Sequence, residues 1–170
     1  MAELPPTGKL PDTAVPMSYA LNLKIDPHAA RFSGQVRIHV KLTKTADHLW
    51  LHARQLDVGH AELIDSSGAH REATFTPRDA SGVAEIAFGT TLPAQEIDLA
   101  LDYSALFNKK LQGLYKVTVG DDAYITSQME AVSARYAFPG FDEPRFKTPF
   151  DITLTVPKDL VAIANTRPQH

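Results

Sequence analysis

The sequence predicts an all-β protein, a sandwich or barrel of roughly ten or more short antiparallel strands. Apolar and polar residues alternate with a period of two over much of its 170 residues, as they do in half-buried strands. Turn-forming residues interrupt this alternation about every 8–12 residues. Helical periodicity is nearly absent, and the best helix candidate is a single turn at residues 131–136. Together these observations favour a fold made of sheets.

An extended N-terminal arm is expected to precede the β-domain. Residues 1–16 carry four prolines and few apolar side chains, and clear alternation begins only after them. We therefore predict an arm over residues 1–16 and a β-sandwich over residues 17–170. The arm lacks the apolar core of a signal peptide, although a chain whose leader has been cleaved would look the same. The compartment of this soluble chain is therefore open between the cytoplasm, the periplasm and the cell exterior.

The strands are expected in a regular series along the chain. Alternation is clearest in the first two, at residues 19–25 and 36–42. Residues 66–68, Ser-Ser-Gly, predict a turn that joins the fourth strand to the fifth. The remaining strands are expected at residues 49–51, 58–64, 73–76, 83–88, 97–103, 114–119, 123–129 and 150–156.

Two further features of the C-terminal half can be predicted. The Gly120-Asp121-Asp122 sequence predicts a tight hairpin between the strands on either side of it. A run at residues 160–164 indicates the start of one more strand. Because the chain stops soon after this run, we expect it to be a piece of a longer polypeptide.

Composition narrows the classes of function. Apolar residues make up 44% and charged residues 22% of the chain, which is typical of a single globular domain. The net charge is −3 and the basic residues are scattered, so no face is expected to bind nucleic acid. The absence of cysteine excludes disulfides and thiolate zinc sites. No stretch approaches the ~20 apolar residues of a membrane span.

The chain lacks recognisable catalytic machinery. His48 and His52 have the spacing of an HExxH zinc motif, but Leu49 stands where the general base would be. In a strand, four residues span ~13 Å, which is too far for two ligands of one ion. We therefore interpret both histidines as surface residues. No G-x-S-x-G, P-loop or G-x-G-x-x-G sequence occurs either, so we expect no catalytic residue and no metal site in this chain.

The sequence ITSQMEA at residues 125–131 offers a binding candidate. If it forms a strand, Gln128 and Glu130 project from the same face, with Met129 behind them. A carboxylate beside an amide oxygen suits an ammonium group, which has three donors and no acceptor. Spacing alone favours an exposed polar face on an edge strand, and a binding site is the alternative.

The sequence ARYAFPGFDEPRFKTPF at residues 134–150 predicts a structural motif. Asp142 is expected to accept backbone N–H groups of a turn and to pair with Arg135. Glu143 is assigned a structural role beside them, and Pro144 is expected to set a turn. The phenylalanines of this stretch are expected to cluster: Phe138, Phe141, Phe146 and Phe150.

The ordered motifs resemble the N-terminal domain of the aminopeptidase N type of zinc aminopeptidase, the gluzincins. The family pattern of GLY, then TQMEP, then DAR-x-AFPCFDEP-x-FKA-x-F is similar to this sequence from Gly113 to Phe150. The opening P-x-x-Y-x-L and F-x-G-x-V strands of the family resemble the segments that begin at Pro16 and Phe32. The resemblance covers residues 16–166, nearly the whole chain.

The resemblance implies a saddle-shaped, all-β sandwich in a larger enzyme. It implies that Gln128 and Glu130 bind the free α-amino group of a peptide substrate, with a weaker contribution from Met129. Zinc, the HExxH-x18-E motif and the GxMEN loop would belong to a catalytic domain that packs against this one. Neither motif occurs here, so the chain alone is expected to bind no zinc and to be inactive.

Three positions depart from the family pattern, and two alternatives stay open. Ala131 stands where Pro is frequent, Tyr136 where Arg is frequent and Gly140 where Cys is frequent. A stand-alone β-sandwich for binding or scaffolding is the first alternative. A member related to leukotriene hydrolases is the second, and Glu130 argues against it because those relatives tend to lack this Glu. Side-chain specificity, oligomeric state and physiological peptides are not determined by the sequence.

Overall fold

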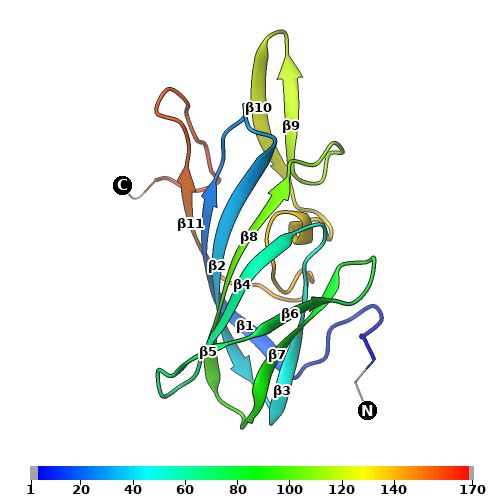
Figure 1. Cartoon of the computed structure of the whole chain (residues 1–170). Coiled ribbons are helices and arrows are strands. Elements are labelled where there is room, and N and C mark those ends of the chain that lie inside the picture. The colour runs from blue at the N-terminus through cyan, green and yellow to red at the C-terminus, as the bar shows by residue number, and fades with distance from the viewer. Residues whose placement is uncertain (1–3, 169–170) are drawn as a thin grey trace.

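A computed structural model describes residues 4–168 and confirms the all-β class (Figure 1). Eleven strands form three sheets, and the only helical element among the described residues is a 3₁₀ turn, η1 (Ala134–Tyr136). In sheet order, the six-stranded sheet contains β11 (Phe150–Thr155), β1 (Ala14–Lys24), β2 (Arg31–Leu42), β8 (Glu96–Leu106), β4 (Asp57–Ile64) and β5 (His70–Glu72). The three-stranded sheet contains β3 (Ala46–His52), β7 (Val83–Leu92) and β6 (Thr74–Pro77), and the two-stranded sheet contains β10 (Asp122–Gln128) and β9 (Gly113–Val119).

The core lies between the six-stranded and three-stranded sheets. Strand β2 alternates buried and exposed residues over almost its whole length, as a strand with one wet face must. Its Val36 and Ile38 lie opposite Leu101 and Leu99 of β8, and all four side chains are buried. The three-stranded sheet closes the core from the other side with buried residues such as Leu51 of β3. This arrangement is the predicted sandwich.

One pair of strands departs from the antiparallel expectation. Strand β11 pairs in parallel with β1 at the edge of the six-stranded sheet, and Phe150 lies opposite Tyr19. The side chains of β11 that share a face with buried Tyr19 and Leu21 are Phe150 and Ile152, yet these are 42% and 54% exposed. The core-facing side of this edge strand is therefore only partly covered by the described residues.

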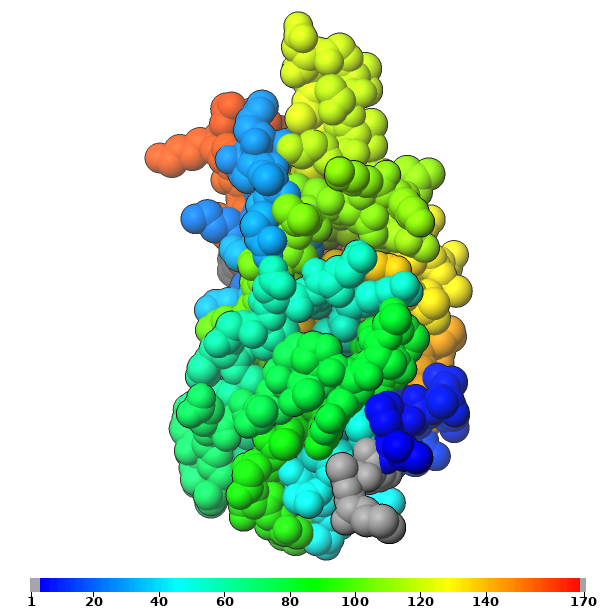
Figure 2. All heavy atoms as spheres, turned by 45° about the vertical axis from the view of Figure 1, so that its right-hand side comes forward, coloured from blue at the N-terminus to red at the C-terminus, as the bar shows by residue number. Residues whose placement is uncertain are grey.

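The β9–β10 hairpin, with the predicted turn at Gly120, projects from the body of the protein (Figures 1 and 2). Its base is fixed by the pairing of Gly113 with Gln128. Gly113 has φ +62°, and a Cβ atom there would lie 2.6 Å from Cβ of Tyr136 in η1. Only glycine satisfies both the backbone conformation and the close approach. The start of β9 therefore packs directly against η1, and the end of β10 is paired with it.

Several expected elements differ in the structure. The strand expected at residues 73–76 is present as β6, but an unpredicted short strand, β5, precedes it, so the turn at residues 66–68 joins β4 to β5. Strand β6 instead pairs with β7 in the other sheet. The run at residues 160–164 is not a strand, and its Val161 and Ile163 are 86% and 89% exposed. Apolar alternation there has no neighbouring strand edge to pair with in the described chain.

The N-terminal arm lies against the body rather than away from it (Figure 2). Leu10 is buried, and the Thr13 carbonyl accepts a hydrogen bond from the backbone N–H of Thr43 at 2.9 Å. Strand β1 begins at Ala14, where it already pairs with Leu42 of β2. Residues 14–16 of the expected arm are thus part of the sheet.

None of the helical residues among 4–168 forms a helix of the length and apolarity that crossing a bilayer requires.

Candidate functional site

Strand β10 ends at Gln128, so the strand-face argument for Gln128 and Glu130 is wrong for the second residue. The two residues are linked by a local turn instead, in which the backbone N–H of Glu130 donates to Oε1 of Gln128 at 3.1 Å. Both side chains are exposed, whereas Met129 is half-buried and packs against the core. The carbonyl of Met129 accepts a hydrogen bond from the backbone N–H of Ser133 at 2.9 Å, and the Glu130–Ala131 peptide bond is cis.

A cleft of about 390 Å³ opens beside this turn. Met129 and Glu130 line one part of it, and the FDEP motif lines another; Gln128 is not among its lining residues. The walls are largely aromatic and come from segments far apart in the sequence. The aromatic residues of the lining are Tyr19, Phe138, Phe141, Phe146 and Phe150.

Tyr19 holds the aromatic wall together. Its ring stacks on Phe150 with centroids 4.3 Å apart and makes an edge contact with Phe138 at 6.2 Å. Its hydroxyl oxygen accepts the backbone N–H of Phe141 at 2.9 Å. Burial raises the pKa of the Tyr19 hydroxyl above its ordinary value, so this group stays neutral. The predicted phenylalanine cluster is therefore anchored on a residue of β1.

Beneath the cleft, Arg135 and Asp142 form a buried ion pair. Nε of Arg135 lies 2.9 Å from Oδ2 of Asp142, and both side chains are 10% exposed. The guanidinium also donates to the carbonyls of Ser81 at 3.0 Å and Asp142 at 3.1 Å. The Asp142 carboxylate in turn accepts the backbone N–H of Arg135 at 3.2 Å. Both charges are therefore fully engaged within the chain, as the structural interpretation of this motif requires.

His52 belongs to this motif, and interpreting it as a surface residue was wrong. It is 1% exposed, and its Nδ1 accepts the backbone N–H of Asp142 at 3.2 Å. Two backbone hydrogen bonds, at 2.8 and 2.9 Å, also join it to Gly140. Burial, reinforced by the nearby Arg135 cation, lowers the pKa of His52 to about 4, so the ring is neutral at pH 7. No sequence spacing signals this contact, because 90 residues separate His52 from Asp142.

Glu143 is held by the N-terminal arm. One carboxylate oxygen accepts the backbone N–H of Leu10, and the other accepts from Arg145. Arg145 also donates to the Asp12 carboxylate and to the Leu10 carbonyl. Pro144 follows as an exposed residue of the cleft wall. Glu143 therefore faces the cleft but has no free charge to offer a ligand.

Glu130 differs from the other acidic residues of the cleft. Among residues 4–168, its carboxylate has no hydrogen-bond or ion-pair partner, whereas those of Asp142 and Glu143 are engaged. Lys147 is the only lysine in the lining. Across the described part of the chain, no three or more His, Cys, Asp or Glu side chains come together to hold a metal ion. The free anion of this site is thus Glu130, at the rim of an aromatic cleft.

The chain is thus an all-β domain with one unpaired carboxylate beside an aromatic cleft. Comparison with known proteins identifies its family. The family model described as the peptidase M1 N-terminal domain matches residues 15–170. The chain belongs to this family, as the ordered motifs of the sequence predict.

The relatives share this region and extend well beyond it. Aminopeptidase M1-B of Oryza sativa subsp. japonica is 34% identical over 93% of this chain and 18% of its own length. The puromycin-sensitive aminopeptidase of Caenorhabditis elegans is 33% identical over 92% of this chain and 17% of its own length. Aminopeptidase N of Acetobacter pasteurianus is 32% identical over 93% of this chain and 45% of its own length. The chain spans less than half the length of each of these relatives.

Proposed function

We propose that this chain is the N-terminal domain of a zinc-dependent aminopeptidase that removes N-terminal amino acids from peptides. Within it, Gln128 and Glu130 anchor the α-ammonium group of the substrate. The observation that carries the proposal is the Glu130 carboxylate, which is unpaired at the rim of an aromatic cleft in a chain of the M1 family. The named relatives are aminopeptidases, which supports the same activity for the whole protein.

The chemistry of an exopeptidase suits this arrangement. An enzyme that cleaves from the chain end must recognise that end, and the α-ammonium group is what marks it. Ammonium has three donors, and a carboxylate with an amide oxygen supplies acceptors for them. A blocked terminus would leave the Glu130 charge unpaired in a site closed by the substrate, so it would be rejected. Anchoring the first nitrogen also fixes which peptide bond reaches the catalytic groups.

Gln128 retains a free acceptor lone pair on its side-chain oxygen for the substrate ammonium group. Its Oε1 receives the Glu130 backbone N–H at 3.1 Å, and a carbonyl oxygen has a second lone pair. The same hydrogen bond holds the amide beside the Glu130 backbone. We therefore assign Gln128 the second acceptor for the ammonium group and Met129 the apolar floor between the two. We assign structural roles to Arg135, Asp142 and Glu143, because their charged groups are paired within the chain, and to Pro144, which shapes the cleft wall beside them.

A catalytic domain is proposed to cover the partly exposed edge of the sandwich. Phe150 and Ile152 lie on the core-facing side of β11, yet about half of each side chain is exposed. An apolar surface of this kind marks an interface. Zinc, when bound in the whole enzyme, activates a water molecule for attack on the scissile carbonyl. We assign its ligands to that catalytic domain, since the described residues offer no ligand set.

We keep as a proposal the division into an N-terminal arm at residues 1–16 and a β-sandwich at residues 17–170, with residues 14–16 of the arm joining strand β1. A stand-alone binding or scaffold module is the alternative, and the relatives do not favour it, because each named one is a longer aminopeptidase. The gene sequence beyond His170 separates the two ideas. An HExxH motif within a few hundred codons supports the enzyme, and an immediate stop codon supports the module.

The anchor is tested in the full-length enzyme with Glu130→Gln. We expect kcat/KM for amino-acid arylamides with a free amino group to fall by about 100-fold, which is the size of a lost charge-assisted contact of ~3 kcal/mol. The matched control is Glu72→Gln, in an exposed strand at the sheet edge, and it should leave kcat/KM unchanged. An enzyme that cleaves these substrates normally with Gln at position 130 rules out the anchor.

A further inference from the structure

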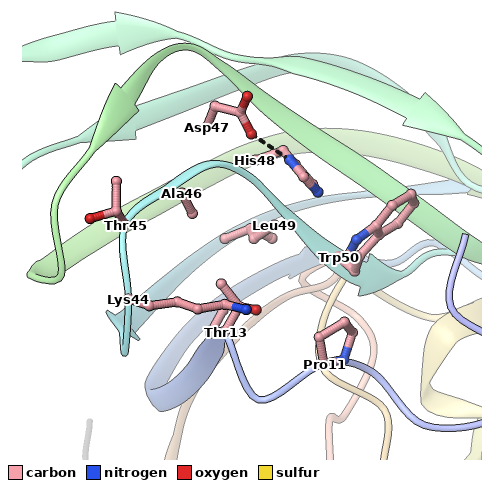
Figure 3. A pocket seen from close by; sticks show the side chains of 10 residues that line it. Pro11, Thr13, Lys44, Thr45, Ala46, Asp47, His48, Leu49 and Trp50 are labelled. Carbon is pink, nitrogen blue, oxygen red and sulfur yellow. Dashed lines mark hydrogen bonds and ion pairs between the residues drawn. The ribbon is translucent and has the colours of Figure 1, made fainter. Parts of the chain in front are cut away.

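A second hollow lies between the N-terminal arm and strand β3, and it shares no lining residue with the Glu130 cleft. Its volume is about 200 Å³, and Figure 3 shows the side chains around it. Residues 11–14 form one wall and residues 44–50 form the other. Nothing in the proposed anchoring of a peptide N-terminus uses this hollow, so its chemistry has to be considered separately.

The single tryptophan of the chain, Trp50, has an indole N–H donor that no acceptor of the described chain satisfies. Trp50 is 4% exposed, and its indole Nε1 is buried with no hydrogen-bond partner among the described residues. In Figure 3 the nitrogen-bearing edge of the ring faces other residues of the lining. The His48 ring lies edge-on to the indole at a centroid distance of 5.5 Å, and a ring is at best a weak acceptor. Buried N–H groups almost always have a partner, so this one indicates an acceptor supplied from outside.

A positive charge accompanies this donor. The Lys44 side chain is exposed and extends along the hollow toward Thr13 (Figure 3), and no ion pair is formed by its ammonium group within residues 4–168. The one acidic residue of the lining, Asp47, is 2.6 Å from Nδ1 of His48, so its carboxylate is already engaged. The hollow therefore presents a cation and an N–H donor, set among the apolar side chains of Pro11 and Leu49.

We infer that this hollow binds a small carboxylate, one of whose oxygens accepts the Trp50 N–H while the other faces the Lys44 ammonium group. A carboxylate accepts at both oxygens and donates at neither, which matches the two groups on offer. The volume lies below the ~300–1,000 Å³ of typical ligand pockets and limits the ligand to the size of acetate or a small amino acid. Free amino acids and simple organic acids share this chemistry, and the experiment distinguishes them.

The experiment uses the indole N–H signal, which is unique because the chain has one tryptophan. The ¹H–¹⁵N spectrum of the 170-residue chain is followed while acetate, glycine or methylammonium chloride is added at constant ionic strength. We expect a saturable shift of the indole signal with carboxylates and none with methylammonium chloride. A shift with both acetate and glycine assigns a general carboxylate site, and a shift with glycine alone assigns a site for free amino acids.

Two variants tie the shift to the proposed contacts. Lys44→Gln should weaken the carboxylate affinity about tenfold, because it removes the positive charge but keeps a polar side chain with N–H donors. Lys110→Gln, an exposed lysine outside the lining, should leave the affinity unchanged. The inference is overturned by an indole signal that ignores both carboxylates, or by equal affinities in the two variants. Activity of the whole enzyme plays no part, so the outcome is independent of the anchor at Glu130.

Discussion

The charged side chains of Arg135 and Asp142 are buried and paired, whereas that of Glu130, a few residues earlier, faces solvent. Arg135 and Asp142 are joined to each other and to backbone groups, with His52 packed beneath them. Glu130 has no such partner in the described chain. The contrast teaches that the presence of charge in a motif does not identify a ligand site. A charge becomes available to a ligand only where the fold leaves it unpaired.

The largest effect is expected from breaking the buried pair. Arg135→Met leaves the Asp142 carboxylate buried without its cation, and the free energy of unfolding in urea should fall by roughly 3–5 kcal/mol. The matched control is Arg37→Met, whose side chain is 56% exposed and lies 3.9 Å from Asp98. That change should cost at most about 1 kcal/mol. Equal losses in the two variants contradict the description of residues 135–142 as a buried, paired frame.

His52 should make stability depend on pH. Its pKa is about 4 when folded, against about 6.5 in an unfolded chain. As the pH falls, the imidazole of the unfolded chain therefore binds a proton before that of the folded chain. The contribution of neutral His52 to the free energy of unfolding is present above pH 6.5 and is lost by about pH 4. The two pKa values correspond to roughly 3 kcal/mol.

The measurement compares urea unfolding at several pH values for the wild-type chain and His52→Asn. Asparagine keeps an acceptor for the Asp142 N–H but does not titrate. The variant should be less stable at pH 7 yet lose less stability between pH 6.5 and 4. Parallel pH profiles for the two chains would show that the His52 ring is not the titrating group.

A smaller loss is expected at the base of the hairpin. Gly113→Ala places a Cβ atom 2.6 Å from Tyr136 at a left-handed backbone position, and we expect a cost of roughly 2–4 kcal/mol. Gly120→Ala is matched in backbone conformation, with φ +61°, but its Cβ meets nothing within 4 Å. It should cost only about 1–2 kcal/mol. The difference between the two free energies of unfolding measures the contact with η1, and no difference means that the contact is loose.

The smallest effect on stability is expected from the substitution of Glu130. Glu130→Gln removes an exposed, unpaired charge, so the free energy of unfolding should change by no more than about 0.5 kcal/mol. Urea unfolding of the same 170-residue chain measures it. A loss similar to that of Arg135→Met would mean that Glu130 is part of the frame, and the loss of activity proposed for this variant would then have a structural cause.

Local patterns predicted much of the fold. Period-two alternation located most of the strands because one face of each is buried, and the Gly120 turn predicted the β9–β10 hairpin. The structure also brings Arg135 and Asp142 together, and they are close enough in sequence for a local turn to do so. Apolar alternation failed at residues 160–164, because a strand also needs a partner edge, and local sequence does not supply one.

Long-range contacts could not be predicted in this way. Phe150 has an alternating sequence around it, but only the assembled sheet places β11 parallel to β1. His52 was interpreted as a surface residue because its spacing from His48 does not suit a metal site, but its burial depends on Asp142, 90 positions away. The strand pattern likewise does not contain the end of β10 at Gln128 or the packing of its partner Gly113 against η1.

By itself, the sequence determined the all-β class, the order of the strands and, through its ordered motifs, membership of the M1 N-terminal domain family. Those properties depend on local alternation, turn chemistry and residue identity. Only the tertiary structure decided which charged side chains are paired within the chain and which remain available to a ligand. Pairing a charge requires a partner within a few ångströms, and in this chain the Glu143 carboxylate accepts the backbone N–H of Leu10, 133 positions away, while the Arg135 guanidinium donates to the carbonyl of Ser81, 54 positions away.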